Sequence, residues 1–201
     1  MAAALSAVRV NAVAAAAGAP VRATRRFPRA ETGGGALTRW MPAYVGIGSN
    51  LDSPVEQVRR AFEALAALPA VRLIARSRLY RSPPLSGDSQ PDYVNAAAGL
   101  LVAVSAPELL SALMGIERAH GRRRDPSSRW QPRTLDLDLL VFGDQRIATA
   151  ELTVPHPGLA GRNFVLFPLF DVAPFLAVPG VGDVATLKAR VDQSSISLEE
   201  A

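Results

Sequence analysis

Apolar residues recur along the chain at spacings that predict the order of its elements. Apolar or alternating runs typical of strands occupy residues 43–48, 71–81, 92–104 and 134–142. Spacings of three and four predict two amphipathic helices, one between Ser53 and Pro69 and one between Ser105 and Gly121. The order strand, helix, strand, strand, helix, strand predicts an α+β fold, a ferredoxin-like βαββαβ sandwich with a C-terminal extension.

The two helices are expected to begin in the same way. Ser53 and Ser105 each stand three residues before a glutamate, with a proline in the first turn. This spacing is typical of a capping box, in which the serine and glutamate side chains each bond a backbone N–H of the other residue. Gly121 is expected to end the second helix because glycine readily adopts left-handed backbone angles.

The other segments carry weaker patterns. They predict a loop over residues 82–91, a short strand over residues 147–154 and a helical segment over residues 158–171. After Pro179 the pattern is weak. We therefore expect one domain over residues 43–180, followed by a C-terminal tail over residues 181–201.

Charge divides the chain into two unequal parts. Residues 1–42 contain six arginines and one acidic residue, Glu31, whereas the other 159 residues contain 16 basic and 17 acidic side chains. The first part is rich in alanine, arginine and glycine without periodicity, so we expect a disordered extension. Its composition fits an organellar transit peptide, although serine is scarce, and fits equally a mis-assigned start codon in a GC-rich bacterial gene.

Composition excludes several classes of protein. The chain has no cysteine, which removes disulfides, thiol catalysis and zinc-thiolate sites, and it has only two histidines, His120 and His156. No apolar run is long enough to span a membrane. The near balance of charges after residue 42 gives no basic surface of the kind that nucleic-acid binders carry. We expect a cytoplasmic monomer that binds neither membranes nor nucleic acid.

Two aspartates mark the candidate chemistry. Asp136 and Asp138 lie two residues apart among leucines, so a strand would place both carboxylates on one face, about 7 Å apart. Carboxylates this close repel each other unless a cation lies between them, and Mg²⁺ with phosphate oxygens suits the arrangement. The arginines at 122–124, 129 and 133 could hold those phosphates. An amphipathic edge strand whose acids pair with these arginines explains the spacing equally well.

Five motifs, in order along the chain, resemble one family. They are G-S-N-L at 48–51, R-S-P-P-L at 81–85, P-D-Y-V-N at 91–95, W-Q-P-R-T-L-D-L-D at 130–138 and L-T-V-P-H at 152–156. Together they resemble the 6-hydroxymethyl-7,8-dihydropterin pyrophosphokinases of folate biosynthesis, from about Ala43 to about Pro174. The resemblance implies the ferredoxin-like fold, two Mg²⁺ ions, and transfer of the terminal diphosphate of ATP to the pterin hydroxymethyl oxygen with release of AMP.

The resemblance also assigns residues to the metal and the nucleotide. It implies that Asp136 and Asp138 bind the metal ions, and that Arg122 and Arg133 handle the phosphates in catalysis. The other positions implied to contact ATP are Arg124, Trp130, His156, Arg162 and Glu117. A helix glutamate is more often a solvated side chain. Pro157 replaces a tyrosine that is frequent in relatives, and the segment between Arg124 and Trp130 is one residue longer than in the best-known members.

The pterin is expected to bind on a neighbouring strand. Tyr93 and Asn95 are two residues apart and share a strand face, where a ring can stack and an amide can both donate and accept. By resemblance Asn95 bonds the pterin edge and Tyr93 and Phe164 flank the ring. The backbone near Ser82, Pro83 and Leu85 would complete the pocket. Both aromatic residues also fit ordinary core positions, whereas an asparagine in an apolar strand needs a polar partner.

Two other classes of protein remain to be compared with this pattern. A ferredoxin-like RNA-binding module carries basic and aromatic residues on its central strands, where this chain has Asp136 and Asp138. A catalytically silent relative would bind ATP or pterin for regulation. The intact Asn95 and Trp130 argue against that alternative, and Pro157 argues for it.

Overall fold

The largest sheet of the protein is antiparallel and places the candidate strands side by side. The computed structural model describes residues 39–85, 89–121 and 132–200. The strands of this sheet are β1 (Met41–Ser49), β2 (Val71–Arg76), β3 (Tyr80–Ser82), β4 (Tyr93–Val102), β5 (Asp136–Phe142) and β10 (Ser197–Leu198). Their order is β10-β3-β4-β1-β5, and β2 also pairs with β4. The central strand β1 therefore lies between β4 and β5.

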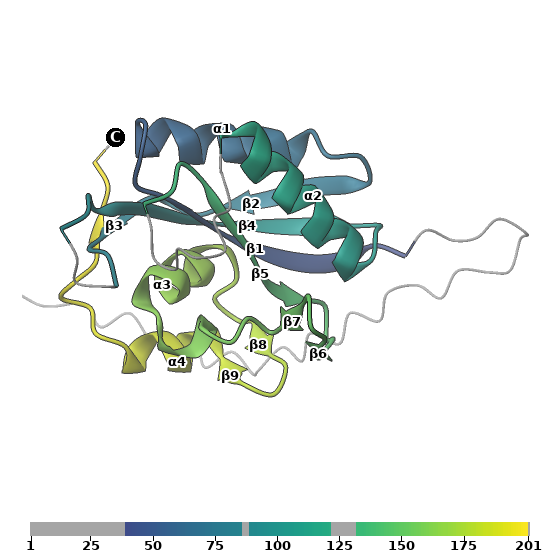
Figure 1. Cartoon of the computed structure of the whole chain (residues 1–201). Helices are drawn as coiled ribbons and strands as arrows, with labels where there is room; N and C mark the ends of the chain where they lie inside the picture. Colours follow the sequence, from purple (N-terminus) through teal and green to yellow (C-terminus); the bar gives the residue numbers. More distant parts are fainter. Residues whose placement is uncertain (1–38, 86–88, 122–131, 201) are drawn as a thin grey trace, which may run out of the picture. The chain divides into compact units, whose positions relative to one another are not determined.

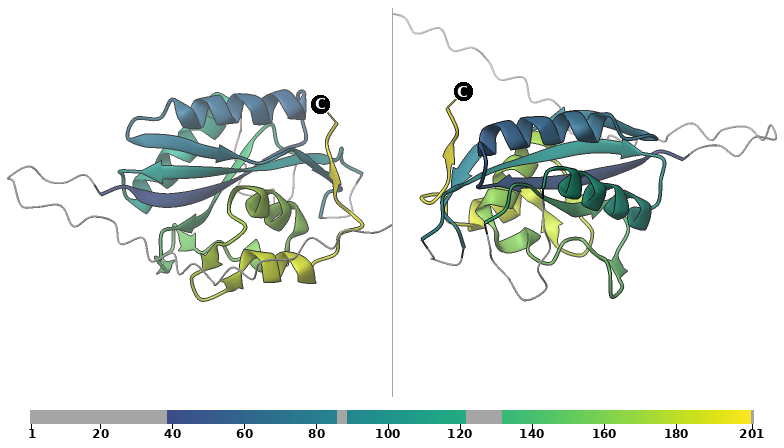
Figure 2. Two further views of the ribbon diagram at one scale, coloured as in Figure 1. Left: turned by 180° about the vertical axis from the view of Figure 1, so that it is seen from behind. Right: turned by 45° about the horizontal axis from the view of Figure 1, so that its top comes forward.

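Helices cover both faces of this sheet, which gives an α+β architecture (Figure 1). The helices α1 (Pro54–Ala66) and α2 (Ala106–Ala119) lie on one face, and α3 (Asn163–Val172) and α4 (Val184–Arg190) lie on the other, as the two views in Figure 2 also show. The smaller elements are the hairpin of β6 (Ile147–Ala148) and β7 (Thr153–Val154), the 3-10 helix η1 (Leu159–Gly161), and the hairpin of β8 (Ala177–Val178) and β9 (Gly182–Asp183).

Alternation along the strands builds one core on each face. Val45, Ile47 and Leu137 belong to the core under α1 and α2. Leu140 and Leu166 belong to the core under α3 and α4. Successive strand residues point to opposite faces, so the residues that alternate with Val45, Ile47 and Leu137 point toward α3. Asp136 and Asp138, which alternate with Leu137, lie on this face of β5.

The strand expected over residues 71–81 is two strands, β2 and β3, and that prediction was wrong. Both strands pair with β4, and the chain leaves the ladder between them. At the break, the Ser77 hydroxyl accepts a hydrogen bond from the Ala97 N–H at 2.8 Å and donates to the Arg78 carbonyl at 2.6 Å. Ser77 thus replaces a ladder contact with side-chain bonds, which an alternation pattern does not reveal.

Only one of the two expected capping boxes forms. Ser105 and Glu108 exchange both bonds at the start of α2, and Gly121, with a φ of 81°, follows the end of that helix as expected. Ser53 instead has a left-handed backbone with a φ of 64° and makes no side-chain cap bond. The capping box predicted at Ser53 is therefore wrong, because these backbone angles differ from the extended ones that the motif requires.

The boundaries of the folded part also differ from the pattern. The first strand begins at Met41, and the Arg72 guanidinium lies 4.4 Å from the ring centroid of Trp40. Residues 147–154 form the hairpin of β6 and β7 rather than one strand, and the helical segment after residue 158 is divided into η1 and α3. After residue 180 the chain forms β9, α4 and β10, where the pattern predicted no clear element.

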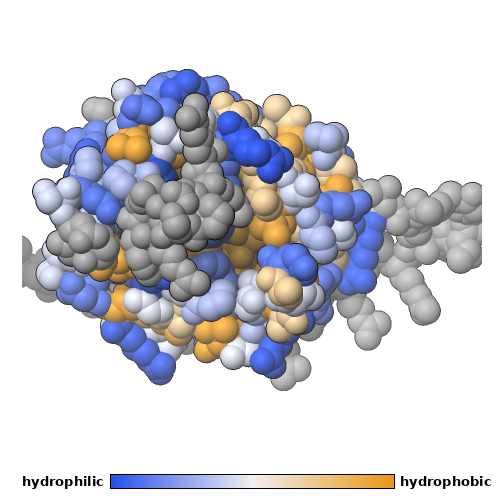
Figure 3. Space-filling model, in the orientation of Figure 1, coloured by the Kyte–Doolittle hydropathy of each residue, from blue (hydrophilic) through white to orange (hydrophobic). Residues whose placement is uncertain are grey.

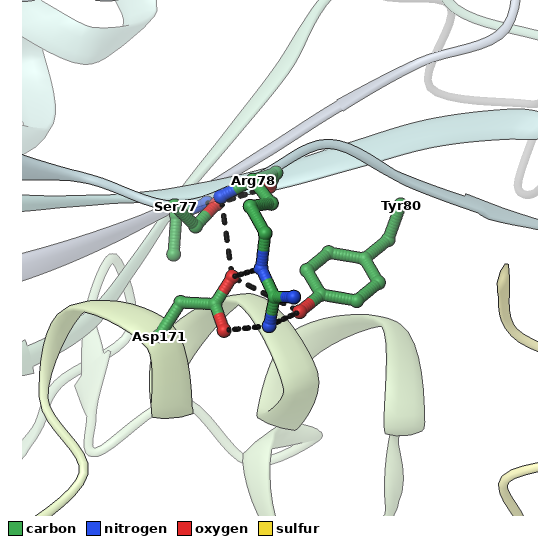
Figure 4. Close-up of polar contacts among 5 residues, drawn as sticks. Ser77, Arg78, Tyr80 and Asp171 are labelled. Atoms are coloured by element: carbon green, nitrogen blue, oxygen red, sulfur yellow. Dashed lines mark hydrogen bonds and ion pairs between the residues drawn. The ribbon is translucent and has the colours of Figure 1, made fainter. Parts of the chain in front are cut away.

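A polar cluster fastens α3 to the sheet (Figure 4). Asp171 of α3 accepts hydrogen bonds from the Arg78 guanidinium at 2.7 and 3.0 Å and from the Tyr80 hydroxyl at 2.9 Å. Burial alone would raise the pKa of Asp171, but its hydrogen bonds to Arg78 and Tyr80 hold that pKa below the usual range. The cluster connects α3, which carries Phe164, to β3 and the residues just before it.

Asp171→Asn is expected to destabilise the protein by about 1–3 kcal/mol, because it breaks a partly buried charged network. The folded pKa of Asp171 is depressed, so its contribution is present above the unfolded pKa, near 4, and is lost as the pH falls through the folded value. Urea unfolding at pH 7 and pH 3 measures this effect. The gap between wild type and variant should narrow at pH 3, and a gap that widens there would contradict the assignment.

Within the described ranges, no helix is both long enough and apolar enough to cross a membrane.

Candidate active site

The two aspartates of β5 project from the same face, as their spacing predicts. Leu135, Leu137 and Leu139 are at most 4% exposed and pack into the core under α1 and α2. Asp136 and Asp138 therefore point to the opposite face, and both line one cleft. The leucines anchor the strand, so the carboxylates are held in place by packing on the far side of the sheet.

Each aspartate has a different environment. The Arg133 guanidinium donates to Asp136 Oδ2 at 2.6 Å, which offsets the charge of that carboxylate. Asp138 has no such close cation among the described residues; its nearest cationic candidate is His156, with Nε2 4.0 Å from Oδ2. The Asp138 side chain is 42% exposed, and the partial loss of its hydration, followed by the negative charges of Asp136 and Glu117, raises the pKa of Asp138 to about 7. A cation bound between the aspartates would relieve this repulsion.

Glu117 is buried and does not lie on a solvated helix face. It is 2% exposed, and its Oε1 accepts a hydrogen bond from the Leu137 N–H at 2.9 Å. Leu137 stands between the two aspartates on β5, the edge strand next to β1. Glu117 therefore accepts from the Leu137 N–H, a backbone donor at the open edge of the sheet. This bond holds β5 in place at the residue between Asp136 and Asp138.

His156 is placed to offer an N–H to the acidic cluster. Its Nδ1 accepts a hydrogen bond from the Gly158 N–H at 3.1 Å, so in the neutral ring the proton is on Nε2, the atom that faces Asp138. Burial lowers the pKa of His156, and the positive charge of Arg162 lowers it further. Arg162 also lowers the pKa of Asp138, which places its charge near both groups.

These side chains line a cleft of about 360 Å³. Its polar lining includes Glu117, Arg133, Asp136, Asp138, Glu151, Thr153 and His156, and its apolar lining includes Leu110, Met114, Leu137, Leu139, Leu152 and Pro157. Figure 3 shows apolar residues inside a hollow on this face of the molecule. Acidic groups for a cation beside an apolar wall are suited to a nucleotide, whose phosphates are charged and whose base is flat.

The expected pterin residues lie across β1 from this cleft and do not line it. Asn95 is 5% exposed, and its Nδ2 donates to the Ser82 hydroxyl at 3.0 Å and to the Tyr93 carbonyl at 3.4 Å. Gly48 of β1 pairs with Asn95 on one side and with Asp136 on the other. The two groups of candidate residues therefore lie on the same face of the sheet, with β1 between them.

The other expected pterin positions lie near the start of β4 and on α3. Ser82 ends β3 and pairs with Tyr93, and Pro83 and Leu85 follow directly, with Leu85 56% exposed. Phe164 lies at the start of α3, on the same side of the sheet as Asn95, and the Arg162 guanidinium is 5.9 Å from its ring centroid. The structure brings Ser82, Tyr93 and Asn95 together and places Phe164 on the same side of the sheet. Their contact with a pterin stays a prediction.

Three expected nucleotide residues, Arg122, Arg124 and Trp130, lie outside the described residues.

Comparison with known proteins decides the family. The family model described as 7,8-dihydro-6-hydroxymethylpterin-pyrophosphokinase matches residues 44–174. The chain belongs to this pyrophosphokinase family. The 2-amino-4-hydroxy-6-hydroxymethyldihydropteridine pyrophosphokinase of Pseudomonas aeruginosa is 48% identical over 136 residues, which is 68% of this chain and 83% of the relative. That of Haemophilus influenzae is 41% identical over 157 residues, 78% of this chain and 97% of the relative.

Solved structures of the family share the fold of this pyrophosphokinase chain. HPPK-DHPS of Plasmodium falciparum with pteroate superposes with a TM-score of 0.60 at 13% identity, over 76% of this chain and 42% of that one. Its A437G form gives a TM-score of 0.59 at 12% identity, over 78% of this chain and 44% of that one. The chain thus spans less than half the length of these structures, and the likeness concerns the fold alone.

One buried residue of this pyrophosphokinase connects the two sides of the site, and sequence reasoning gave it no role. Asn50 follows β1 and is 2% exposed. Its Oδ1 accepts from the Arg133 N–H at 2.7 Å, and its Nδ2 donates to the Pro91 carbonyl at 3.2 Å. Its own N–H donates to the Arg133 carbonyl at 3.0 Å. The G-S-N-L motif was a signal for this residue, but its partners are distant in sequence.

Asn50→Ala is expected to cost about 1–3 kcal/mol of stability and to lower kcat at least tenfold, because the Arg133 N–H loses its partner and the guanidinium loses its fixed base. Ser49→Ala is the matched control, since the buried Ser49 hydroxyl donates to the Thr134 carbonyl at 2.7 Å and makes no hydrogen bond to Arg133 or Pro91. Melting curves and AMP release measure both variants. Equal losses of kcat in the two would mean that Asn50 has no specific role.

Proposed function

We propose that this chain transfers a diphosphate group from ATP to 6-hydroxymethyl-7,8-dihydropterin, giving AMP and the pterin diphosphate in folate biosynthesis. The observation that carries the proposal is the juxtaposition across one strand. Asp136 of the acidic cleft and Asn95 of the pterin region are register neighbours of the same residue, Gly48. A phosphate donor and a pterin acceptor bound at these positions would meet over β1.

The two aspartates fit a Mg²⁺ site. They offer hard oxygen ligands on one face, and the negative charges of Asp136 and Glu117, together with burial, raise the pKa of Asp138, which favours a cation beside it. Within the described residues no group of three or more acidic, histidine or cysteine side chains is placed to hold a metal. The remaining ligands of two Mg²⁺ ions would come from phosphate oxygens and water. When bound, Mg²⁺ neutralises charge on the phosphate oxygens during transfer.

The chain's own residues bind and orient the reactants. The pterin hydroxymethyl oxygen forms a bond to the β-phosphorus of ATP, the bond from that phosphorus to the oxygen bridging to the α-phosphorus breaks, and AMP leaves with that oxygen. The hydroxyl proton is released to water. Arg133, and Arg122 by resemblance, supply fixed positive charge to the phosphates, while His156 and Arg162 border the same region.

The pterin is oriented by the other side of the site. The Asn95 Nδ2 donates to Ser82 and Tyr93, so Oδ1 would be the amide atom that accepts from a ligand. The amino and ring N–H groups of a pterin are donors that match it. Tyr93 and Phe164 would flank the ring, and the backbone at Ser82, Pro83 and Leu85 would close the pocket.

The finer features of the protein follow from the same picture. The sheet order β2-β4-β1-β5, with one helix after β1 and one after β4, supports a ferredoxin-like βαββαβ core extended by β3 and the C-terminal elements.

The direct test is product analysis with ATP labelled separately at its β- and γ-phosphorus. The β-label and the γ-label should each be recovered in the pterin product, and AMP should form only when the pterin is present. Formation of ADP with transfer of the γ-label alone, or AMP formation independent of pterin, would contradict diphosphate transfer.

A further inference from the structure

Gly48 occupies the one position in the sheet that adjoins both halves of the proposed site. It lies on β1 and pairs with Asn95 of β4 and with Asp136 of β5. Because it alternates with the buried Ile47, it faces the same side of the sheet as those two side chains. It carries no side chain, so no atoms beyond the backbone of β1 occupy the space between the Asn95 and Asp136 side chains.

The chain itself does not require glycine at this position. Among the described residues, the glycines with positive φ are Gly121, Gly143, Gly180 and Gly182, and Gly48 is not among them. A Cβ at Gly48 would lie 3.5 Å from Asn95 Oδ1 and 4.0 Å from Asp136 Cβ, which are ordinary contact distances. Glycine within a strand is also less favourable than alanine by roughly 0.5–1 kcal/mol. Neither backbone strain nor crowding explains the missing side chain.

A methyl group at Gly48 would instead obstruct a ligand. The nearest atom to the added Cβ is Asn95 Oδ1, the amide atom that accepts no hydrogen bond from the described residues. The next atoms are Asp136 Cβ and Tyr93 Cδ1, both at 4.0 Å. A methyl group would therefore cover part of Asn95 Oδ1. It would also fill space between the pterin ring and the carboxylates at the phosphates.

We propose that Gly48 is a specificity-determining residue, whose missing side chain leaves Asn95 Oδ1 open to the pterin and leaves room for its hydroxymethyl group to reach the phosphate beside Asp136. The inference rests on the proposed function and adds a residue to it. It explains why a strand that would be more stable with alanine has glycine at the point where the two reactants meet.

Gly48→Ala tests the proposal, with Gly46→Ala as the matched control. Gly46 is on the same strand and face and pairs with Asp138. The three atoms nearest to an added Cβ there all belong to the Leu140 side chain, at 3.4–3.6 Å, whereas those nearest to one at Gly48 belong to Asn95, Asp136 and Tyr93. Without ligand, both variants should melt within a few degrees of wild type. Gly48→Ala should weaken binding of 6-hydroxymethylpterin at least tenfold by titration calorimetry and leave the affinity for Mg²⁺ and a non-hydrolysable ATP analogue within threefold. Gly46→Ala should bind both ligands as wild type does.

The outcomes separate this inference from the function on which it rests. If Gly48→Ala binds the pterin as tightly as wild type with the same kcat, the role of Gly48 is overturned while diphosphate transfer stands. If its ligand-free melting temperature falls well below that of Gly46→Ala, the chain does require glycine there, and the inference also fails. If wild type forms no AMP with pterin, the proposed function itself is wrong.

Discussion

Asp138→Asn is expected to slow single-turnover AMP release by roughly 10²–10⁴, because it removes about 3–5 kcal/mol of charge stabilisation that Mg²⁺ gives the phosphate oxygens. Asparagine keeps the shape of the side chain and deletes its charge. Asp136→Asn should have an effect of the same order, although it also frees the Arg133 guanidinium, which is 2.6 Å from Asp136 Oδ2. Rapid-quench measurements across a Mg²⁺ titration should show the loss to be largest at limiting Mg²⁺.

Stability should change in the opposite direction. Asp138 has a folded pKa of about 7, above its unfolded value near 4, so its ionisation costs stability as the pH rises between those values. The metal-free Asp138→Asn protein lacks this cost and should melt at or above wild type at pH 8. Asp144→Asn, which changes an exposed carboxylate in the turn after β5, is the control and should alter neither property. Normal turnover, or unfolding, of both cleft variants would make the aspartates structural.

Asn95→Ala is expected to weaken pterin binding by about 5- to 150-fold, corresponding to roughly 1–3 kcal/mol for a buried amide that leaves ligand groups unpaired. The affinity for the ATP analogue with Mg²⁺ should change little, because β1 lies between Asn95 and Asp136 of the acidic cleft. Separate calorimetric titrations with each ligand give the comparison. A loss confined to the nucleotide, or equal losses for both ligands, would show that Asn95 does not belong to a pterin pocket.

Much of the sheet side of the site followed from local sequence. The leucines that alternate with Asp136 and Asp138 must be buried. Their burial determines which face of the strand both carboxylates occupy, and this can be predicted from one segment alone. Tyr93 and Asn95 were placed by the same argument. The box at Ser105 formed as its spacing predicted, whereas the box at Ser53 did not, because the backbone turned left-handed there.

What the sequence could not indicate depends on long-range contacts. The hydrogen bonds that the Asn50 side chain makes to Pro91 and Arg133 span 41 and 83 positions. The break between β2 and β3 depends on a Ser77 hydroxyl bound to the backbone of Ala97 on another strand. No periodicity reports such pairs, since each is set by the register of strands that are distant in the chain.

The C-terminal elements were missed for a similar reason. β10 is only two residues long and forms through pairing with β3, reinforced by the Arg81 guanidinium, which donates to both oxygens of Glu199 at 2.7 Å. A two-residue strand has no pattern of its own. Its position is set by the edge that it covers.

The most direct measurement of the central claim is the anomalous scattering of Mn²⁺ in crystals that also hold a non-hydrolysable ATP analogue and 6-hydroxymethylpterin. Mn²⁺ accepts the same hard oxygen ligands as Mg²⁺. Two anomalous peaks are expected between the phosphates and the carboxylates of Asp136 and Asp138, with the pterin edge on Asn95. Peaks that lie elsewhere, with both carboxylates bound only to arginines, would contradict the account.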